Sequence, residues 1–123
     1  MTAAGASTVQ ANPALATRVG RAPGRVVVGL TGELDASTAP ALRRLLDDLV
    51  EGQGNLNVAV DLSGLAWVDA DGLGALVASA QRLRARGRRL TLTGVRPRTY
   101  GALEAAGLTR AFAIEASPQV EVA

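Results

Sequence analysis

The chain has 123 residues, of which 48% are hydrophobic and 20% charged, and its formal net charge is +2. This length suits one domain with a single hydrophobic core and excludes a two-domain enzyme. The absence of cysteine and histidine excludes disulfides, thiolate nucleophiles, cysteine zinc sites and histidine general bases.

The two ends of the chain differ in composition from its middle. Residues 1–14 are rich in alanine, threonine, serine and glycine without an apolar period, so we expect a disordered N-terminal tail. We place the folded domain at 15–117 and a C-terminal tail at 118–123. No basic segment precedes an apolar one at the N-terminus, and no apolar run approaches the ~20 residues that span a bilayer. We therefore expect a cytoplasmic protein that does not insert into a membrane.

The first predicted elements are two strands. Residues 15–20 form a short strand, RAPG places Pro23 before Gly24 as a type II turn prefers, and VVVGL is β-branched. We expect the two strands to pair as a hairpin. In the following TGELDASTAP, Gly32 ends the strand, Asp35 or Thr38 can cap a helix, and Pro40 suits a first helical turn.

Helical and strand patterns then alternate to the end of the chain. A first helix has one apolar stripe at i, i+3, i+4, i+7, made of Leu42, Leu45, Leu46 and Leu49. The segment EGQGN breaks it, and 56–65 is a strand. A second helix follows DADG and stops near Gly87, with its stripe at Leu73, Leu76, Val77, Ala80 and Leu83. A strand at 89–95, a helix at 96–107 and a strand at 111–116 complete an α/β domain, with a small, mixed, largely parallel sheet and helices mainly on one face.

Two acids, Asp69 and Asp71, lie where the central strand gives way to the second helix. Asp71 directly precedes Gly72 and the helical stripe, which is where an N-cap belongs. Asp69 is expected to brace the same turn with a hydrogen bond. The motif DADGL also resembles the nucleophile motif of haloacid-dehalogenase-like phosphatases, which work with Mg²⁺. This remote alternative lacks the downstream acidic pair that would hold the metal, since the later acids are Glu104, Glu115 and Glu121.

A longer resemblance joins the two loops. The segments LTGELDAST and VDLSGLAWVDADGLGAL, some thirty residues apart, resemble the STAS domain, the sulfate-transporter and anti-sigma-factor-antagonist module. The likeness extends over 15–116 and includes the order of strands and helices. It implies a bacterial partner-switching protein that regulates transcription by binding. In such antagonists, the position of Asp71 is a serine or threonine that an anti-sigma kinase phosphorylates, and the unmodified antagonist holds the anti-sigma factor and frees a sigma factor.

The chain departs from that pattern at its central position. Asp71 cannot become a phosphoserine and carries a constant negative charge, so this copy resembles the modified state of its relatives, with less charge than a phosphate. The resemblance implies a partner-binding surface and no catalytic residue, metal or cofactor. We assign this surface to Glu33, Asp35, Ser37, Thr38, Asp69, Asp71, Gly72 and Ala75.

Several partners remain open. The resemblance favours an anti-sigma factor of the ATP-binding kinase type. The alternatives are a lipid-transport ATPase or permease, to which the chain would be an accessory subunit, a stress-signalling scaffold, and a nucleotide. Pairing of the chain with itself also stays open. Direct nucleic-acid binding is not expected, because no aromatic residue is interleaved with the arginines that cluster at the end of the second helix, and these arginines offset the helix dipole there. They are Arg82, Arg84, Arg86, Arg88 and Arg89.

Overall fold

The computed structural model describes residues 14–52 and 56–115, which form one five-stranded sheet with the strand order β1-β2-β3-β4-β5. The strands are β1 (Leu15–Ala22), β2 (Arg25–Leu34), β3 (Asn57–Val68), β4 (Leu90–Thr93) and β5 (Ala113–Ile114). β1 pairs with β2 in antiparallel fashion, and each later pair is parallel. The predicted hairpin and the mixed, largely parallel sheet are confirmed. The proposed tails lie outside the described residues apart from Ala14, whose carbonyl accepts a hydrogen bond from the Glu33 amide at 2.8 Å.

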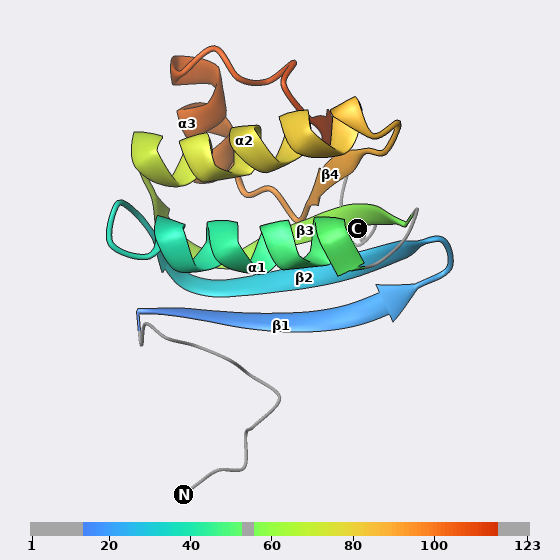
Figure 1. Ribbon diagram of the computed structural model, residues 1–123. Coiled ribbons are helices and arrows are strands. Elements are labelled where there is room, and N and C mark those ends of the chain that lie inside the picture. The colour runs from blue at the N-terminus through green and yellow to red at the C-terminus, as the bar shows by residue number, and fades with distance from the viewer. Residues whose placement is uncertain (1–13, 53–55, 116–123) are drawn as a thin grey trace, which may run out of the picture.

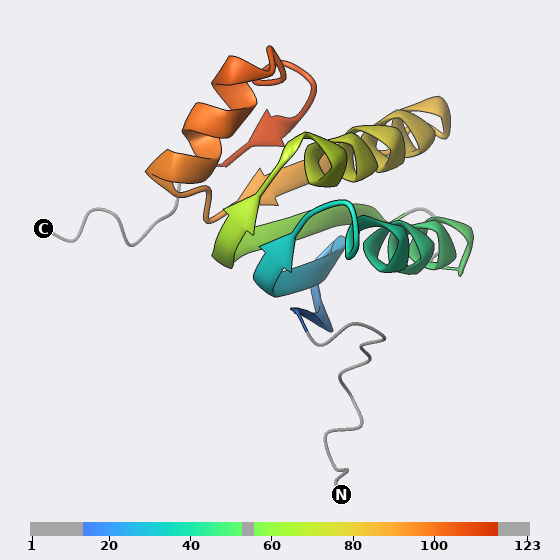
Figure 2. The ribbon, with the colours of Figure 1, turned by 90° about the vertical axis from the view of Figure 1, so that its left-hand side faces the viewer.

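Three helices cover the two faces of the sheet unequally. α1 (Ala39–Gly52) and α2 (Ala70–Ala85) lie side by side on one face, whereas α3 (Pro97–Ala105) lies on the opposite face, near the β4 and β5 edge (Figures 1 and 2). The prediction of helices mainly on one face is therefore confirmed.

The core lies between the sheet and the α1 and α2 layer. The stripe predicted for α1 is buried at Leu42, Leu46 and Leu49, with Leu45 packed at its margin. Alternate residues of the two central strands meet it, because successive side chains of a strand point to opposite faces. These are Val26, Val28, Leu30, Val58, Val60 and Leu62, all at most 1% exposed. Each such side chain stabilises the fold by about 1.5–3 kcal/mol.

Several strand boundaries differ from the sequence prediction. β2 continues past its predicted end at Gly32 to Leu34, and β4 is shorter than the predicted 89–95. β3 continues past the predicted end at residue 65 to Val68, because β2 stays paired with it through two register shifts, the second between Gly32 and Glu33. In the described part of the strand predicted at 111–116, only Ala113 and Ile114 form a strand. β4 itself is only four residues long and offers little edge to pair with, and the Ala111 amide instead donates to the Leu108 carbonyl in a turn.

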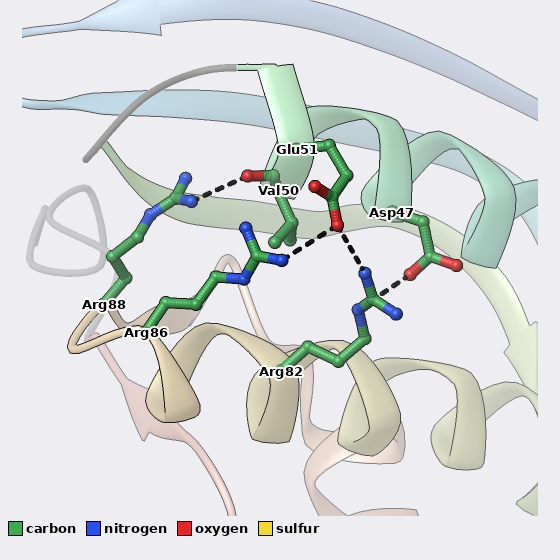
Figure 3. A network of polar contacts seen from close by, with 6 residues as sticks. All are labelled: Asp47, Val50, Glu51, Arg82, Arg86 and Arg88. Atoms are coloured by element: carbon green, nitrogen blue, oxygen red, sulfur yellow. Dashed lines mark hydrogen bonds and ion pairs between the residues drawn. The ribbon is translucent and has the colours of Figure 1, made fainter.

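The arginine cluster at the end of α2 holds the two neighbouring helices together (Figure 3). Arg82 pairs with Asp47 at 3.3 Å and with Glu51 at 3.1 Å, and Arg86 pairs with Glu51 at 2.9 Å. Such exposed ion pairs contribute little each, about 0–1 kcal/mol. The prediction that these arginines act at the end of their own helix therefore missed their contacts with α1.

Arg88 makes the buried contact at this end of the molecule. Its side chain donates from Nε to the Leu56 carbonyl at 2.7 Å and from Nη1 to the Val50 carbonyl at 2.9 Å. The residue is 7% exposed, and burial lowers the pKa of its guanidinium, with a further contribution from the charge of Arg86. One cation thus satisfies a carbonyl in the last turn of α1 and another at the entry to β3.

Candidate functional site

Three connections meet at the edge of the sheet where the parallel strands end. Residues 35–38 connect β2 to α1, Asp69 connects β3 to α2, and residues 94–96 connect β4 to α3. A groove of about 510 Å³ lies there, between the starts of α1 and α2. It is lined by Ala36, Ala39, Pro40, Arg43, Asp71, Gly74 and Ala75. The two loops singled out from the sequence therefore border one surface, which we call the α1–α2 groove.

Asp35 organises the loop on the α1 side of this groove. Its Oδ1 accepts hydrogen bonds from the Ser37 hydroxyl at 2.8 Å and from the amides of Ser37 at 2.9 Å and Thr38 at 3.2 Å. The Ser37 hydroxyl is the main cause that lowers the pKa of Asp35 below its usual range, and the two amides act in the same direction against partial burial. The loop thus favours the charged form of the Asp35 carboxylate and holds it in hydrogen bonds within the loop.

Thr38 supports the same loop from the interior. Its hydroxyl donates to the Glu33 carbonyl at 2.9 Å and accepts from the Asp35 amide at 2.9 Å. Thr38 is completely buried. Its side chain therefore shapes the loop and does not reach a partner in this conformation.

The structure assigns the N-cap of α2 to Asp69, and the prediction of Asp71 as the cap is wrong. Asp69 has an extended backbone, with φ −123° and ψ −175°, and its Oδ1 accepts a hydrogen bond from the Gly72 amide at 3.0 Å. A cap must stand just outside the helical conformation to reach the amide two or three residues ahead. Asp71 already belongs to the first turn of α2, so its side chain cannot do this.

Asp71 is left free for other contacts. Its side chain is exposed and lines the α1–α2 groove. Within 14–52 and 56–115, no hydrogen bond or ion pair engages its carboxylate. The positive end of the α2 dipole favours a negative charge in this turn. The result is a free anion fixed on a rigid helix beside a groove.

Gly72 and Ala75 lie under this surface. A Cβ on Gly72 would lie 2.6 Å from the Leu34 Cγ and 2.6 Å from the Leu34 carbonyl oxygen, so the start of α2 rests directly on the end of β2. The Asp69 amide also donates to the Leu34 carbonyl, at 3.1 Å. Ala75 is 6% exposed and belongs to the core. Both residues therefore position the groove, whereas the neighbouring Gly74 is exposed within it.

Glu33 lies apart from the α1–α2 groove. It pairs with Trp67 of β3, while the next pair joins Leu34 to Val68. Leu34 points toward α2, and adjacent strand residues point to opposite faces. Glu33 and Trp67 therefore lie together on the face of α3. The residues assigned to one partner-binding surface from the sequence therefore lie on two faces of the sheet. Glu33 lies on the α3 face, and the residues of the α1–α2 groove lie on the other.

The sequence interpretation missed two features of this edge. Trp67, the chain's only tryptophan, is 52% exposed, although it lies within β3. A lone tryptophan in a chain poor in aromatic residues was the available signal. Arg43 and Pro40 of α1 also line the α1–α2 groove, and the sequence predicted only that Pro40 suits a first helical turn.

In the described part of the chain, no group of three or more acidic, histidine or cysteine side chains is arranged to hold a metal ion. No helix among residues 14–52 and 56–115 combines the length and the hydropathy needed to cross a membrane.

Comparisons with known proteins agree on one family. The family model described as "Mlab, STAS domain" matches residues 17–115. An anti-sigma-B factor antagonist of Listeria monocytogenes is 32% identical over 80 residues, which cover 65% of this chain and 69% of that protein. An anti-sigma factor antagonist from Mycobacterium paratuberculosis has a similar crystal structure, with a TM-score of 0.73 at 26% identity, covering 85% of this chain and 89% of that chain.

A more distant structure shares the fold. The Bacillus cell fate determinant SpoIIAA in its phosphorylated form has a TM-score of 0.65 at 20% identity, covering 86% of this chain and 95% of that chain. The mixed, largely parallel sheet and the placement of the helices agree with the fold predicted from the sequence. The chain belongs to the STAS domain family, and its sequence and structure are similar to those of anti-sigma factor antagonists.

Proposed function

We propose that the protein is an anti-sigma factor antagonist-like binding module that regulates transcription by protein–protein contact and catalyses no reaction. The observation that carries the proposal is the free, exposed carboxylate of Asp71 in the first turn of α2, beside the α1–α2 groove. The relatives named as anti-sigma factor antagonists support the class of function. The partner is an anti-sigma factor of the ATP-binding kinase type.

Asp71 acts in this proposal as a permanent charge. The family resemblance implies that relatives carry a phosphorylatable serine or threonine at this position, and a phosphate there would bring about −1.5 to −2 charge and three acceptor oxygens. One carboxylate supplies about half to two thirds of that charge at the same helix end. The protein therefore resembles the phosphorylated form only in part. A partner with acidic groups facing Asp71 still binds it, but more weakly than it would bind a serine variant.

The hydrogen bonds of the neighbouring acidic residues support this role for Asp71. Asp69 is committed to the α2 cap, and Asp35 is committed to its own loop. Neither can move toward a partner without leaving amides unsatisfied. Asp71 is the acid beside the α1–α2 groove whose removal changes the surface charge without removing a described hydrogen bond.

Capture of partners from the native cell tests the proposal. The baits are the wild type, Gly74→Arg, which fills the α1–α2 groove, and Arg84→Glu, which changes an exposed charge at the far end of α2. We expect mass spectrometry to identify an ATP-binding anti-sigma factor with the wild type and with Arg84→Glu, but not with Gly74→Arg. Capture of a transport ATPase, a permease or a signalling scaffold instead, or equal capture by all three baits, would contradict it.

A further inference from the structure

A second groove lies on the other face of the sheet, between the end of β3 and the start of α3. It has a volume of about 640 Å³ and is lined by Leu65, Ala66, Trp67, Val68, Arg96, Pro97, Arg98, Thr99 and Ala102. We call it the Trp67 groove. α3 packs on the face away from α1 and α2 (Figure 2), so the sheet separates this groove from Asp71.

Trp67 gives the groove an apolar wall. Its side chain is 52% exposed in a chain with only one residue each of tryptophan, tyrosine and phenylalanine. Burial of a tryptophan removes about 150–250 Å² from water. Tryptophan and arginine are also the residues most enriched among those that dominate binding energy at protein interfaces. An exposed tryptophan beside a groove is therefore a strong anchor for a partner.

Two arginines give the other wall its charge. Arg96 and Arg98 are both exposed, and no ion pair or side-chain hydrogen bond engages either of them in the described residues. No acidic side chain lines the groove. Arg96 is also the N-cap of α3 and makes no side-chain capping bond, so the positive end of that helix adds to the same field.

The surroundings of the groove restrict the kind of anion that fits. Glu33 stands beside Trp67 on the neighbouring strand, and Asp69 follows two residues later. The phosphates of a nucleic acid that crossed Trp67 would be repelled by these two carboxylates. A short acidic peptide needs cations only at its few contacts, which Arg96 and Arg98 provide. The local charges thus favour a protein segment over a nucleic acid.

We propose that the Trp67 groove binds a short acidic segment of a partner protein. An apolar side chain of that segment packs on Trp67, and flanking carboxylates pair with the guanidinium groups of Arg96 and Arg98, which suit carboxylates geometrically. This site is separate from the α1–α2 groove and does not depend on the role of Asp71. It supplies a second contact surface on the opposite face of the domain.

Fluorescence of the single tryptophan reports directly on this groove. The probes are a peptide with one leucine flanked by glutamates, the same peptide with lysines in place of the glutamates, inorganic phosphate and oligothymidine. We expect a saturable change in Trp67 emission with the glutamate peptide alone. Chemical shifts of the amides at 65–68 and of Arg96, Arg98 and Thr99 give a second readout that does not require a change in emission.

Charge-matched variants make the test specific. Arg96→Glu combined with Arg98→Glu should weaken the glutamate peptide by at least about tenfold, since both close charges are reversed. Arg84→Glu combined with Arg89→Glu makes the same change in net charge at the far end of the domain and should leave affinity within about twofold. Equal binding of the lysine peptide, stronger binding of oligothymidine, equal loss in both double variants, or no saturable response in either readout would overturn the proposal.

Discussion

The Oδ1 atom of Asp69 lies 3.0 Å from the backbone nitrogen of Gly72, and this hydrogen bond separates the roles of two acids that stand one residue apart. Asp69 caps the N-terminus of α2. Asp71 lies within the first turn of the helix and lines the α1–α2 groove, where no described residue bonds to its carboxylate. One acid is needed for the fold, and the other is available for recognition. The first prediction follows from this difference.

Replacement of the two acids should have unequal effects on stability. Asp69→Ala removes the N-cap and should lower the free energy of unfolding by about 1 kcal/mol. Asp71→Ala loses only an exposed charge near the helix dipole, which is worth about 0.5 kcal/mol or less. Urea unfolding followed by circular dichroism measures both values. A larger loss for Asp71→Ala than for Asp69→Ala would show that the cap is assigned to the wrong residue.

Two glycines of the same helix turn provide a matched pair. Gly72→Ala places a Cβ 2.6 Å from the Leu34 carbonyl oxygen and should destabilise the domain by about 1–3 kcal/mol, because backbone must move. At Gly74 a Cβ would meet no atom within 4 Å, so Gly74→Ala should stabilise α2 by about 0.5–1 kcal/mol. Thermal unfolding of the two variants distinguishes these signs. Similar shifts in the same direction would contradict the close approach of α2 to β2.

The bond between Ser37 and Asp35 predicts a pH effect. Because the Ser37 hydroxyl is the main cause of the lowered pKa of Asp35, Ser37→Ala should raise that pKa toward the usual value of about 3.9. A lowered pKa in the folded state adds stability above the unfolded pKa, and this stability is lost as the pH falls through the folded value. The wild type should therefore exceed Ser37→Ala in stability at neutral pH, and the difference should shrink below about pH 4.

Titration of the Asp35 carboxyl carbon by NMR checks this prediction directly. The midpoint should lie at a lower pH in the wild type than in Ser37→Ala. An equal or higher midpoint in the wild type would show that the hydroxyl does not stabilise the charged carboxylate.

The buried arginine at the far end of the domain predicts a larger loss. Arg88→Met keeps the length of the side chain but removes its bonds to the carbonyls of Val50 and Leu56. We expect a loss of about 2–3 kcal/mol in unfolding free energy, because two carbonyls lose a charged donor. Arg84→Met is the control at an exposed position of α2 and should stay within about 0.5 kcal/mol of the wild type. Equal effects would mean that water replaces the Arg88 contacts at no cost.

The periodic parts of the fold could be predicted from the sequence, because they depend on local patterns. The leucine stripe of α1 and the β-branched strand VVVGL were identified correctly, and the regular alternation of strands and helices predicted a largely parallel sheet. The short β5 could not be predicted, because its length depends on the edge that β4 offers, which is a property of the folded sheet.

The sequence predicted which segments form the site, but not which residue caps α2 or on which face of the sheet each side chain lies. Which of two nearby acids becomes the cap depends on a single residue's backbone angles, and helix ends from sequence are uncertain by a few residues. The separation of Glu33 from Asp71 depends on the register of β2 against β3, which includes two shifts that no local pattern signals. The exposure of Trp67 follows from that register and from the placement of α3.

The most direct test of the central claim is the affinity of the captured anti-sigma factor for the wild type and for Asp71→Ser, measured by calorimetry with and without ATP. We expect Asp71→Ser to bind at least about tenfold more tightly before ATP is added, because a like charge is removed from the interface, and to lose that gain once serine is phosphorylated. The wild type should show the same affinity with ATP as without it and gain no phosphate by mass. Equal affinities of the two proteins before ATP, or phosphorylation of the wild type with a change in its affinity, would contradict the role of Asp71 as a permanent charge.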